Sequence, residues 1–149
     1  MTLKQKIHTR YQQQVQDKID VFRDMIVALT EDSKNDAKGS AGDKHETALS
    51  MMHIEQEKLN HKLSETLEQK AILDRIDATS VHNKIALGSL VEANGILLFV
   101  SAALPKINID GKNIIALSPQ SPLGGKLMGN EKGFQFEING TDYLIEDIV

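Results

Sequence analysis

Apolar residues in the first half of the chain recur at helical spacing. The first series comprises Leu3, Ile7, Tyr11, Val15, Ile19, Phe22, Ile26 and Leu29. From Val15 onward the steps alternate between four and three residues, which is the period of a coiled-coil seam. A second, less regular series comprises Leu49, Met52, Leu59, Leu63, Leu67, Leu73 and Ile76, with Gln56 and Lys70 where apolar residues are expected. The pattern predicts two long helices.

A polar segment that contains glycine, residues 31–42, separates the two series. Each helix would be about 45 Å long at a rise of about 1.5 Å per residue. A single amphipathic helix of this kind is marginal in water, so the two apolar stripes are expected to bury each other. The simplest arrangement is an antiparallel coiled-coil hairpin with its tip near residues 31–46. A parallel dimeric coiled coil is the alternative, and the glycines argue against it because they would interrupt a continuous helix.

The composition changes near residue 78. Up to Asp77 there is no proline and the only glycines are Gly39 and Gly42, whereas all the prolines and the remaining glycines follow Thr79. This contrast is typical of a helical segment followed by a turn-rich segment. The sequence therefore predicts a hairpin domain over residues 1–78 and a β-rich domain over residues 79–149.

Turn dipeptides divide the second half into apolar runs. Asn94-Gly95 lies between 84–93 and 96–103, Asp110-Gly111 between 107–109 and 114–117, and Asn139-Gly140 between 134–138 and 143–148. Asn-Gly favours the positive φ angles of a type I′ turn and is the strongest short hairpin signal. Ser121-Pro122, with Gly129 beyond, predicts a short helix with Ser as N-cap and Pro at the first position. The expected fold class is α+β, a helical hairpin joined to a small antiparallel sheet with one helix.

Composition and charge narrow the possible functions. The chain has no cysteine, which excludes disulfides and thiolate metal sites. A net charge of −4 argues against non-specific binding of nucleic acid. No apolar window is long enough to span a bilayer and the N-terminal segment is polar, so we expect a cytoplasmic protein.

Most candidate catalytic chemistry fails on spacing. His45, His53 and His61 follow one another at intervals of eight residues, which is about 12 Å along a helix and too far for one zinc ion. The sequence contains no HExxH, GxxxxGK[ST] or GxSxG motif. No feature pairs a serine with a histidine as nucleophile and base.

The segment Gly42–Ala48, at the predicted tip, carries two acidic residues that share a helix face. Asp43 and Glu46 are three residues apart, which makes them neighbours on a helix. In the structural interpretation, Asp43 is an N-cap and Glu46 completes a capping box. In the functional interpretation, the two carboxylates offer hard oxygen ligands to a divalent cation such as Mg²⁺. Both can hold, because a cap fixes the carboxylates that would bind.

The layout resembles the Gre-type bacterial transcript cleavage factors, GreA and GreB, which join an N-terminal coiled-coil hairpin to a C-terminal FKBP-like domain. The tip Gly42-Asp43-x-x-Glu46-x-Ala48 is similar to the family's G-D-x-x-E-N-A. The matching C-terminal segments are Ala86-Leu87-Gly88-Ser89-Leu90-Val91, Ser121-Pro122-Leu123-Gly124-x-x-Leu127-x-Gly129 with Gly133, and Tyr143-Leu144-Ile145 with Ile148. They resemble the family's L-G-S-x-V strand, its S-P-[IL]-G-x-x-L-x-G…G-D helix and strand entry, and its closing Y-x-I-x-x-I. The resemblance covers nearly the whole chain.

The resemblance implies a monomeric transcription elongation factor that binds RNA polymerase and has no enzyme activity alone. The C-terminal domain would dock at the mouth of the secondary channel, and the hairpin would enter it towards the 3′ end of the nascent RNA. Asp43 and Glu46 would help hold a Mg²⁺ ion shared with the polymerase, only in that complex. They would also orient an attacking water for cleavage of backtracked transcripts.

Four positions depart from the family pattern. Thr47 replaces the tip Asn, Leu49-Ser50 replaces the Glu-Tyr that usually follows, and Phe134 stands where Asp usually follows Gly133. These changes leave docking intact and favour an alternative, a regulator that occupies the channel and inhibits the polymerase without stimulating cleavage. A coiled-coil scaffold, in which the tip acids are only caps, is a further alternative.

Overall fold

The computed structural model describes the backbone of residues 1–39 and 43–149, and the side chains of residues 1–32, 34 and 46–149. The elements are α1 (Leu3–Gly39), α2 (Asp43–Asp74), β1 (Leu90–Ala93), β2 (Ile96–Val100), β3 (Ile107–Ile109), β4 (Lys112–Leu117), α3 (Pro122–Leu127), β5 (Gln135–Ile138) and β6 (Thr141–Ile148). The chain forms two compact units, one of Gln13–Lys70 and one of Met1–Gln12 with Ala71–Val149. The fold class is α+β, as the sequence predicts.

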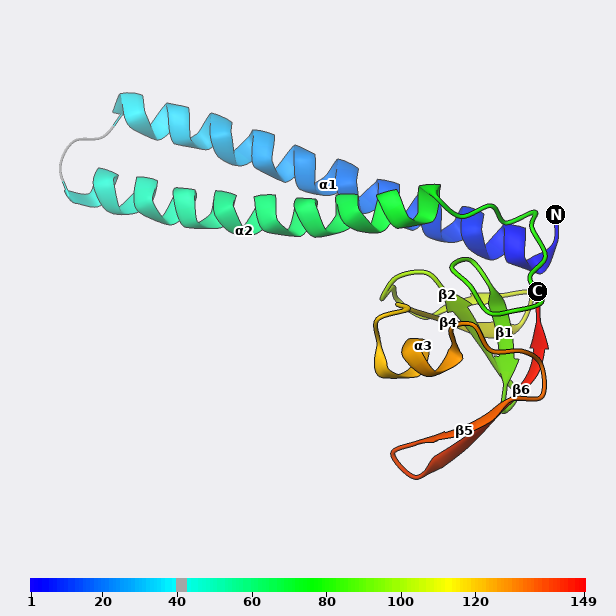
Figure 1. Cartoon of the computed structure of the whole chain (residues 1–149). Helices are drawn as coiled ribbons and strands as arrows, with labels where there is room; N and C mark the ends of the chain where they lie inside the picture. The colour runs from blue at the N-terminus through cyan, green and yellow to red at the C-terminus, as the bar shows by residue number, and fades with distance from the viewer. Residues whose placement is uncertain (40–42) are drawn as a thin grey trace. The chain divides into compact units, whose positions relative to one another are not determined.

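The first unit is an antiparallel pair of helices, formed by α1 and α2 (Figure 1). Val15, Ile19 and Leu59, which the apolar pattern assigns to the seam, are buried. The predicted helical hairpin is therefore confirmed within this unit.

The seam on α2 differs from the predicted series at one residue. Thr66 is only 5 % exposed, whereas Leu67, which the pattern assigned to the seam, is 37 % exposed. Continuing the alternation of three and four residues from Leu59 through Leu63 leads to Thr66, so spacing prevails over side-chain polarity. The hydroxyl of Thr66 donates to the Lys62 carbonyl at 2.8 Å, which satisfies it inside its own helix.

The first helix is longer than the sequence suggested. The expected tip began at Glu31, but α1 continues to Gly39. Residues 32–38 include no proline or glycine, and Lys34, Ala37 and Lys38 are good helix formers. Polarity marked the end of the apolar stripe, not the end of the helix.

The second unit contains a six-stranded sheet in the order β3-β4-β2-β1-β6-β5. Four neighbouring pairs are antiparallel, but β2 and β4 are parallel. The sheet is therefore mostly antiparallel, and the sequence did not indicate the parallel pairing of β2 with β4. Residues 101–106 connect β2 to β3 and leave room between these two strands for β4. The β3–β4 hairpin therefore places β4 beside β2, and the two strands run in the same direction.

The three predicted turns are all present and have the predicted geometry. Both central residues have positive φ, at 52° and 74° for Asn94-Gly95, 53° and 78° for Asp110-Gly111, and 50° and 80° for Asn139-Gly140. These values are those of type I′ turns. The strand before Asn94 is shorter than predicted, since β1 begins at Leu90 and Lys84 forms only an isolated bridge with Glu131.

Strand β2 buries side chains on both faces of the sheet within the second unit. On one face, Leu98 and Val100 belong to a core cluster with Leu127 of α3. Phe99 lies between them in β2 and so points to the opposite face. There its ring stacks on Tyr11 of the first turns of α1, with ring centroids 6.1 Å apart. Residues from the start of the chain thus complete the sheet's second core.

Candidate functional site

The two predicted metal ligands lie at the start of α2. Asp43 is the first residue of α2, but its carboxylate and the capping contact expected for it lie outside the described side chains. Glu46 lies three positions further along the helix and is exposed. The helix therefore places the two positions on one face, as their spacing predicts.

These acidic residues offer an incomplete ligand set for a magnesium ion. Carboxylate oxygens are ligands that Mg²⁺ prefers, and the ion requires near-octahedral coordination. Within the described residues, no three His, Asp or Glu side chains converge to hold a metal. Two carboxylates supply fewer oxygens than this coordination requires.

The residues that follow the tip have different surroundings. Thr47 and Ser50 are exposed, while Leu49 is half-buried. Leu49 occupies the first seam position of α2 that the sequence predicts, three residues before Met52. Leucine at position 49 thus has a packing explanation.

A polar pair lies between the helices on the tip side of the seam. Gln56 occupies a seam position, and its Nε2 donates to Oγ1 of Thr30 at 3.1 Å. Thr30 in turn donates to the Ile26 carbonyl at 2.8 Å. A polar residue at one seam position fixes the register of a coiled coil at a cost in stability. This pair thus aligns the two helices that carry the tip.

The Ser121–Gly129 segment is a structural element whose glycine is sterically required. Oγ of Ser121 caps α3 by accepting from Gly124 N at 3.0 Å, and it donates to the Ser118 carbonyl at 2.7 Å. A Cβ atom at Gly124 would lie 2.0 Å from the Ser118 oxygen, so only glycine allows this approach. Leu127 is fully buried. The predicted N-cap and first-turn proline are confirmed.

The Gly88-Ser89 pair is also structural. Gly88 has φ of 91°, and a Cβ there would lie 2.8 Å from Cγ2 of Ile76. Ser89 is buried, and its Oγ accepts from Ala86 N at 2.9 Å and lies 2.6 Å from Nδ1 of His82. These C-terminal residues therefore have structural roles. The acidic residues at the tip are the candidates for chemistry.

The structure reveals a buried lysine that the sequence analysis missed. Lys4 is only 2 % exposed, and its Nζ donates to the carbonyls of Ser80 at 2.7 Å and Val149 at 3.0 Å. Burial lowers the pKa of Lys4, while the charge of Asp77 acts in the opposite direction. The signal was present in the sequence, since Lys4 shares the face of Ile7 and Tyr11.

The histidines do not form a metal site in the part of the chain that is described. His53 is exposed, and His61 contacts Glu65 at 3.0 Å in an exposed pair one turn apart. The side chain of His45 lies outside the described residues. Among the described helices, none combines the length and the apolar character that crossing a membrane requires.

Comparisons with known proteins give a likeness to solved structures only. No protein-family model matches this sequence, and no curated protein matches it. Among solved structures, the chain is similar to the transcription factor Gfh1, with 18 % sequence identity and a TM-score of 0.36. The match covers 92 % of this chain and 92 % of that chain. At this TM-score the likeness carries no conclusion about activity or partners.

Proposed function

We propose that this protein is an accessory factor that binds bacterial RNA polymerase and acts through its helical hairpin. The observation that supports the proposal is the combination of two features in one chain. One is a long helical hairpin with Asp43 and Glu46 at the start of its second helix. The other is a β-rich unit in which Gly88, Ser121 and Gly124 meet specific structural demands. Both features occur at the positions that carry the resemblance to the Gre-type factors.

In this proposal the β-rich unit docks on the polymerase and the hairpin enters the secondary channel. Asp43 and Glu46 would offer carboxylate oxygens to a Mg²⁺ ion shared with the polymerase active site. Such an ion would lower the pKa of a bound water and, paired with a second ion, would stabilise the attacking and leaving oxygens. The Thr30–Gln56 pair would keep the two helices in register, so that the two acidic residues arrive at a fixed position.

The direct test is the double variant Asp43→Asn with Glu46→Gln. These changes keep side-chain shape and remove the charge that the ion needs. We expect normal binding to the polymerase and at least about a tenfold loss of stimulated cleavage of a backtracked transcript, which is only about 1.4 kcal/mol. The measurement is a single-turnover cleavage assay on a stalled elongation complex, with binding measured in parallel.

A matched control is the pair Glu31→Gln with Asp32→Asn. Both residues are exposed on α1, and the control removes the same charge from the same end of the hairpin. Cleavage should be unchanged in this control. Equal cleavage by the Asp43/Glu46 variant and the wild type would overturn the metal-ligand assignment. A loss of stability of about 1 kcal/mol would then indicate a cap only.

A second function is favoured by the residues after the tip. Thr47 and Ser50 are exposed at positions where the Gre-type factors have Asn and Tyr, and Leu49 occupies a seam position. A protein with this tip would occupy the channel and inhibit the polymerase without stimulating cleavage. It would bind the polymerase and slow nucleotide addition, while the wild-type protein left backtracked transcripts intact.

A further inference from the structure

The last strand in the sheet order, β5, leaves one edge of the sheet open. Its ladder partner is β6, and it is the terminal strand in the order of the six. Native edge strands are usually shielded by lysine, proline, a bulge or very short length. β3, at the opposite edge, has only three residues. β5 has four residues, Gln-Phe-Glu-Ile, with neither lysine nor proline, and Glu137 is its one charged side chain.

The register identifies which backbone groups point to the open edge. Ile138 pairs with Thr141 around the Asn139-Gly140 turn. The closing pair of a two-residue hairpin exchanges ladder hydrogen bonds, and bonded and non-bonded pairs then alternate. The N–H and C=O groups of Gln135 and Glu137 therefore point outward. Among the described residues, no backbone group outside the ladder bonds to either of them.

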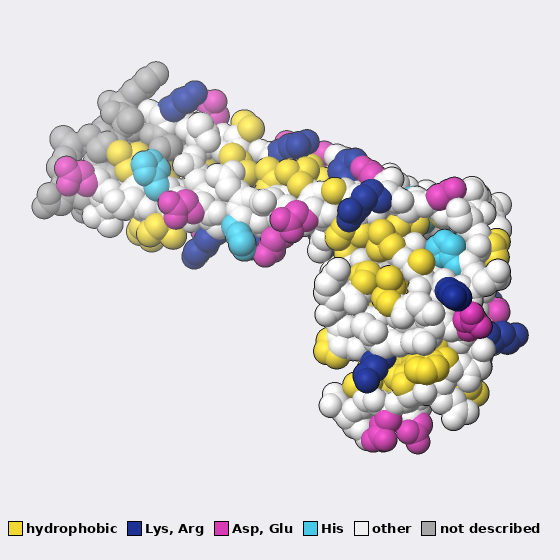
Figure 2. Space-filling view, viewed as in Figure 1, with side chains coloured by type: hydrophobic (Ala, Val, Ile, Leu, Met, Phe, Trp, Pro, Cys, Tyr) yellow, Lys and Arg dark blue, Asp and Glu magenta, His cyan; other side chains and the backbone are white. Residues whose placement is uncertain are grey.

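One face of the hairpin carries unpaired negative charge. Glu137 lies directly opposite Asp142 in the ladder, and both side chains are exposed. Like charges at opposite positions destabilise a sheet. In the described part of the chain, no lysine or arginine forms an ion pair with either carboxylate. Figure 2 shows acidic side chains gathered at the end of the sheet unit where Figure 1 places the β5–β6 hairpin.

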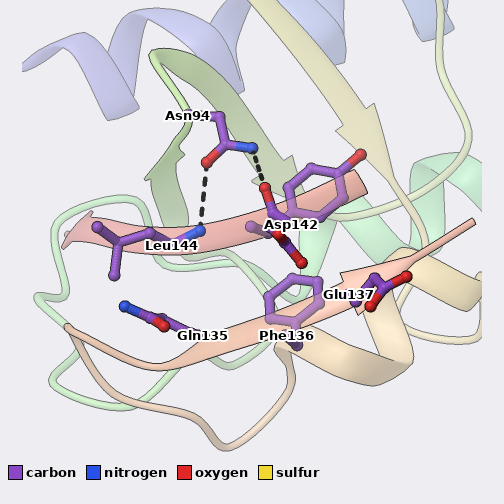
Figure 3. Close-up of a pocket in the computed structure, with 7 residues that line it drawn as sticks. Asn94, Gln135, Phe136, Glu137, Asp142 and Leu144 are labelled. Atoms are coloured by element: carbon purple, nitrogen blue, oxygen red, sulfur yellow. Dashed lines mark hydrogen bonds between the residues drawn. The ribbon is translucent and has the colours of Figure 1, made fainter. Parts of the chain in front are cut away.

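A groove lies at this hairpin, and its lining includes Glu137 and Asp142 of the acidic face as well as Phe136 and Tyr143. It has a volume of about 460 Å³ and is lined by side chains of β5 and β6 and by Asn94 (Figure 3). Asn94 donates to the Asp142 carbonyl at 2.7 Å and accepts from Leu144 N at 3.2 Å, which fixes β6 beside the β1–β2 turn. Leu144 is 40 % exposed in the groove. The site is thus held by hydrogen bonds to the rest of the sheet.

The other face of the hairpin is aromatic. Phe136 stacks on Tyr143 with centroids 5.2 Å apart and on Phe134 with centroids 5.8 Å apart. Phe134 remains 40 % exposed. A strand added beside β5 would therefore meet carboxylates on one face and aromatic rings on the other, since successive side chains alternate between faces.

We propose that β5 accepts a further strand, formed by an extended segment of a partner protein in which basic and apolar residues alternate. The partner's lysine or arginine side chains would face Glu137 and Asp142, and its apolar side chains would face Phe134 and Phe136. Backbone hydrogen bonds to Gln135 and Glu137 would supply affinity, as in other cases of strand addition. A second copy of this chain is the wrong partner, because its β5 carries no lysine or arginine to face Glu137 and Asp142.

The test uses the full-length protein and a fluorescent synthetic peptide of alternating lysine and valine, with binding followed by anisotropy. We expect saturable binding that weakens as salt is added. A peptide of the same composition in Lys-Lys-Val-Val order should bind at least about tenfold more weakly, because it cannot separate charge from apolar surface by face. Equal binding of the two peptides would overturn strand addition.

Substitutions at Glu137 separate the backbone contribution from the charge. Glu137→Pro and Glu137→Thr both remove the carboxylate, but only proline removes the outward N–H. Proline at this position spares the β5–β6 ladder, because the lost group points away from β6. Glu137→Pro should bind about tenfold more weakly than Glu137→Thr, which is within the range of one or two hydrogen bonds. Equal affinities would overturn the proposal.

A second backbone probe does not depend on the folding of a variant. A peptide N-methylated at alternate residues keeps its charges but loses the donors that face β5, so the wild-type protein should not bind it. Binding equal to that of the unmodified peptide would contradict strand addition.

Charge reversal completes the test. Glu137→Lys with Asp142→Lys should abolish binding of the alternating peptide. Glu55→Lys with Glu57→Lys, at exposed positions of α2, makes the same change in net charge and should leave binding intact. Equal loss in both variants would show attraction to net charge alone. Self-association of the wild type that Glu137→Pro abolishes would identify a second copy as the partner and would also overturn the proposal.

Discussion

At the scale of single residues, three side chains carry polar atoms into the unit that contains the sheet. Lys4 bonds to two backbone carbonyls, and the Tyr11 hydroxyl donates to the Pro105 carbonyl at 2.7 Å. Burial raises the pKa of Tyr11 to about 12, so it remains a neutral donor at ordinary pH. His82 contacts the buried hydroxyl of Ser89. Each contact gives a buried polar group a hydrogen-bond partner, and leaving such a group without one would cost folding free energy.

His82 makes the stability of the protein sensitive to mild acid. Partial burial lowers the pKa of His82, and the nearby charge of Lys4 lowers it further. The unfolded chain therefore takes up this proton at a higher pH than the folded protein does. The contribution of His82 is complete above its ordinary pKa of about 6.5 and is lost as the pH falls through the lower pKa of the folded state.

We expect the urea midpoint of the wild type to be lower at pH 5 than at pH 7.5. In the His82→Gln variant this decrease of the midpoint should be smaller. The substitution removes the titrating group while keeping a polar side chain beside Ser89. His53→Gln, at an exposed position of α2, is the control and should retain the wild-type fall. The same fall in His82→Gln and wild type would show that another group causes the pH dependence.

At the scale of elements, local signals predicted most of the architecture. Alternating steps predicted the seam from Val15 onward, and Asn94-Gly95 and Asn139-Gly140 predicted type I′ hairpins. These features depend on residues close together in sequence. The parallel pairing of β2 with β4 depends on where a distant hairpin inserts, which no local pattern records.

The same distinction applies to the candidate site. The sequence placed Asp43 and Glu46 near the start of the second helix, because helical spacing is local. It did not identify the buried surroundings of Lys4, since these come from Ser80 and Val149, far along the chain. The prediction of Leu67 as a seam residue was wrong, because it followed hydrophobicity, whereas the period of the seam requires Thr66.

The Thr30–Gln56 pair gives the element-scale prediction. Replacing the half-buried Gln56 with Leu substitutes an apolar side chain at a seam position, so stability should rise by about 1 kcal/mol. For a chain of this size that is about 3 °C in melting temperature. Glu57→Leu places the same side chain at the exposed neighbouring position and should change stability by less than about 0.5 kcal/mol. A Gln56→Leu variant that melts below the wild type would show that the pair stabilises the hairpin as well as setting its register.

At the scale of the whole molecule, the predicted boundary near residue 78 differs from the division into compact units. The unit that contains the sheet includes Met1–Gln12, although these residues belong to the predicted hairpin domain. Tyr11 and Ile7 are fully buried there. This division does not decide whether residues 79–149 fold alone, because an isolated domain needs only a hydrophobic core of its own that is large enough for folding. The domain division remains a prediction of the composition change.

The final prediction tests that division and the docking role together. Limited proteolysis should cut between Asp77 and Asn83 or at the tip, and a fragment of residues 80–149 should unfold cooperatively. Its midpoint should lie below that of the full chain, because the face of Phe99 loses the ring of Tyr11. Tyr11→Ala in the full chain removes the same ring and should cost about 3–5 kcal/mol.

If the fragment is folded, it should compete with the full-length protein for RNA polymerase. A folded fragment that does not compete would indicate that the docking surface lies on the hairpin. A fragment without cooperative unfolding would show that the first turns of α1 are an obligatory part of the C-terminal domain.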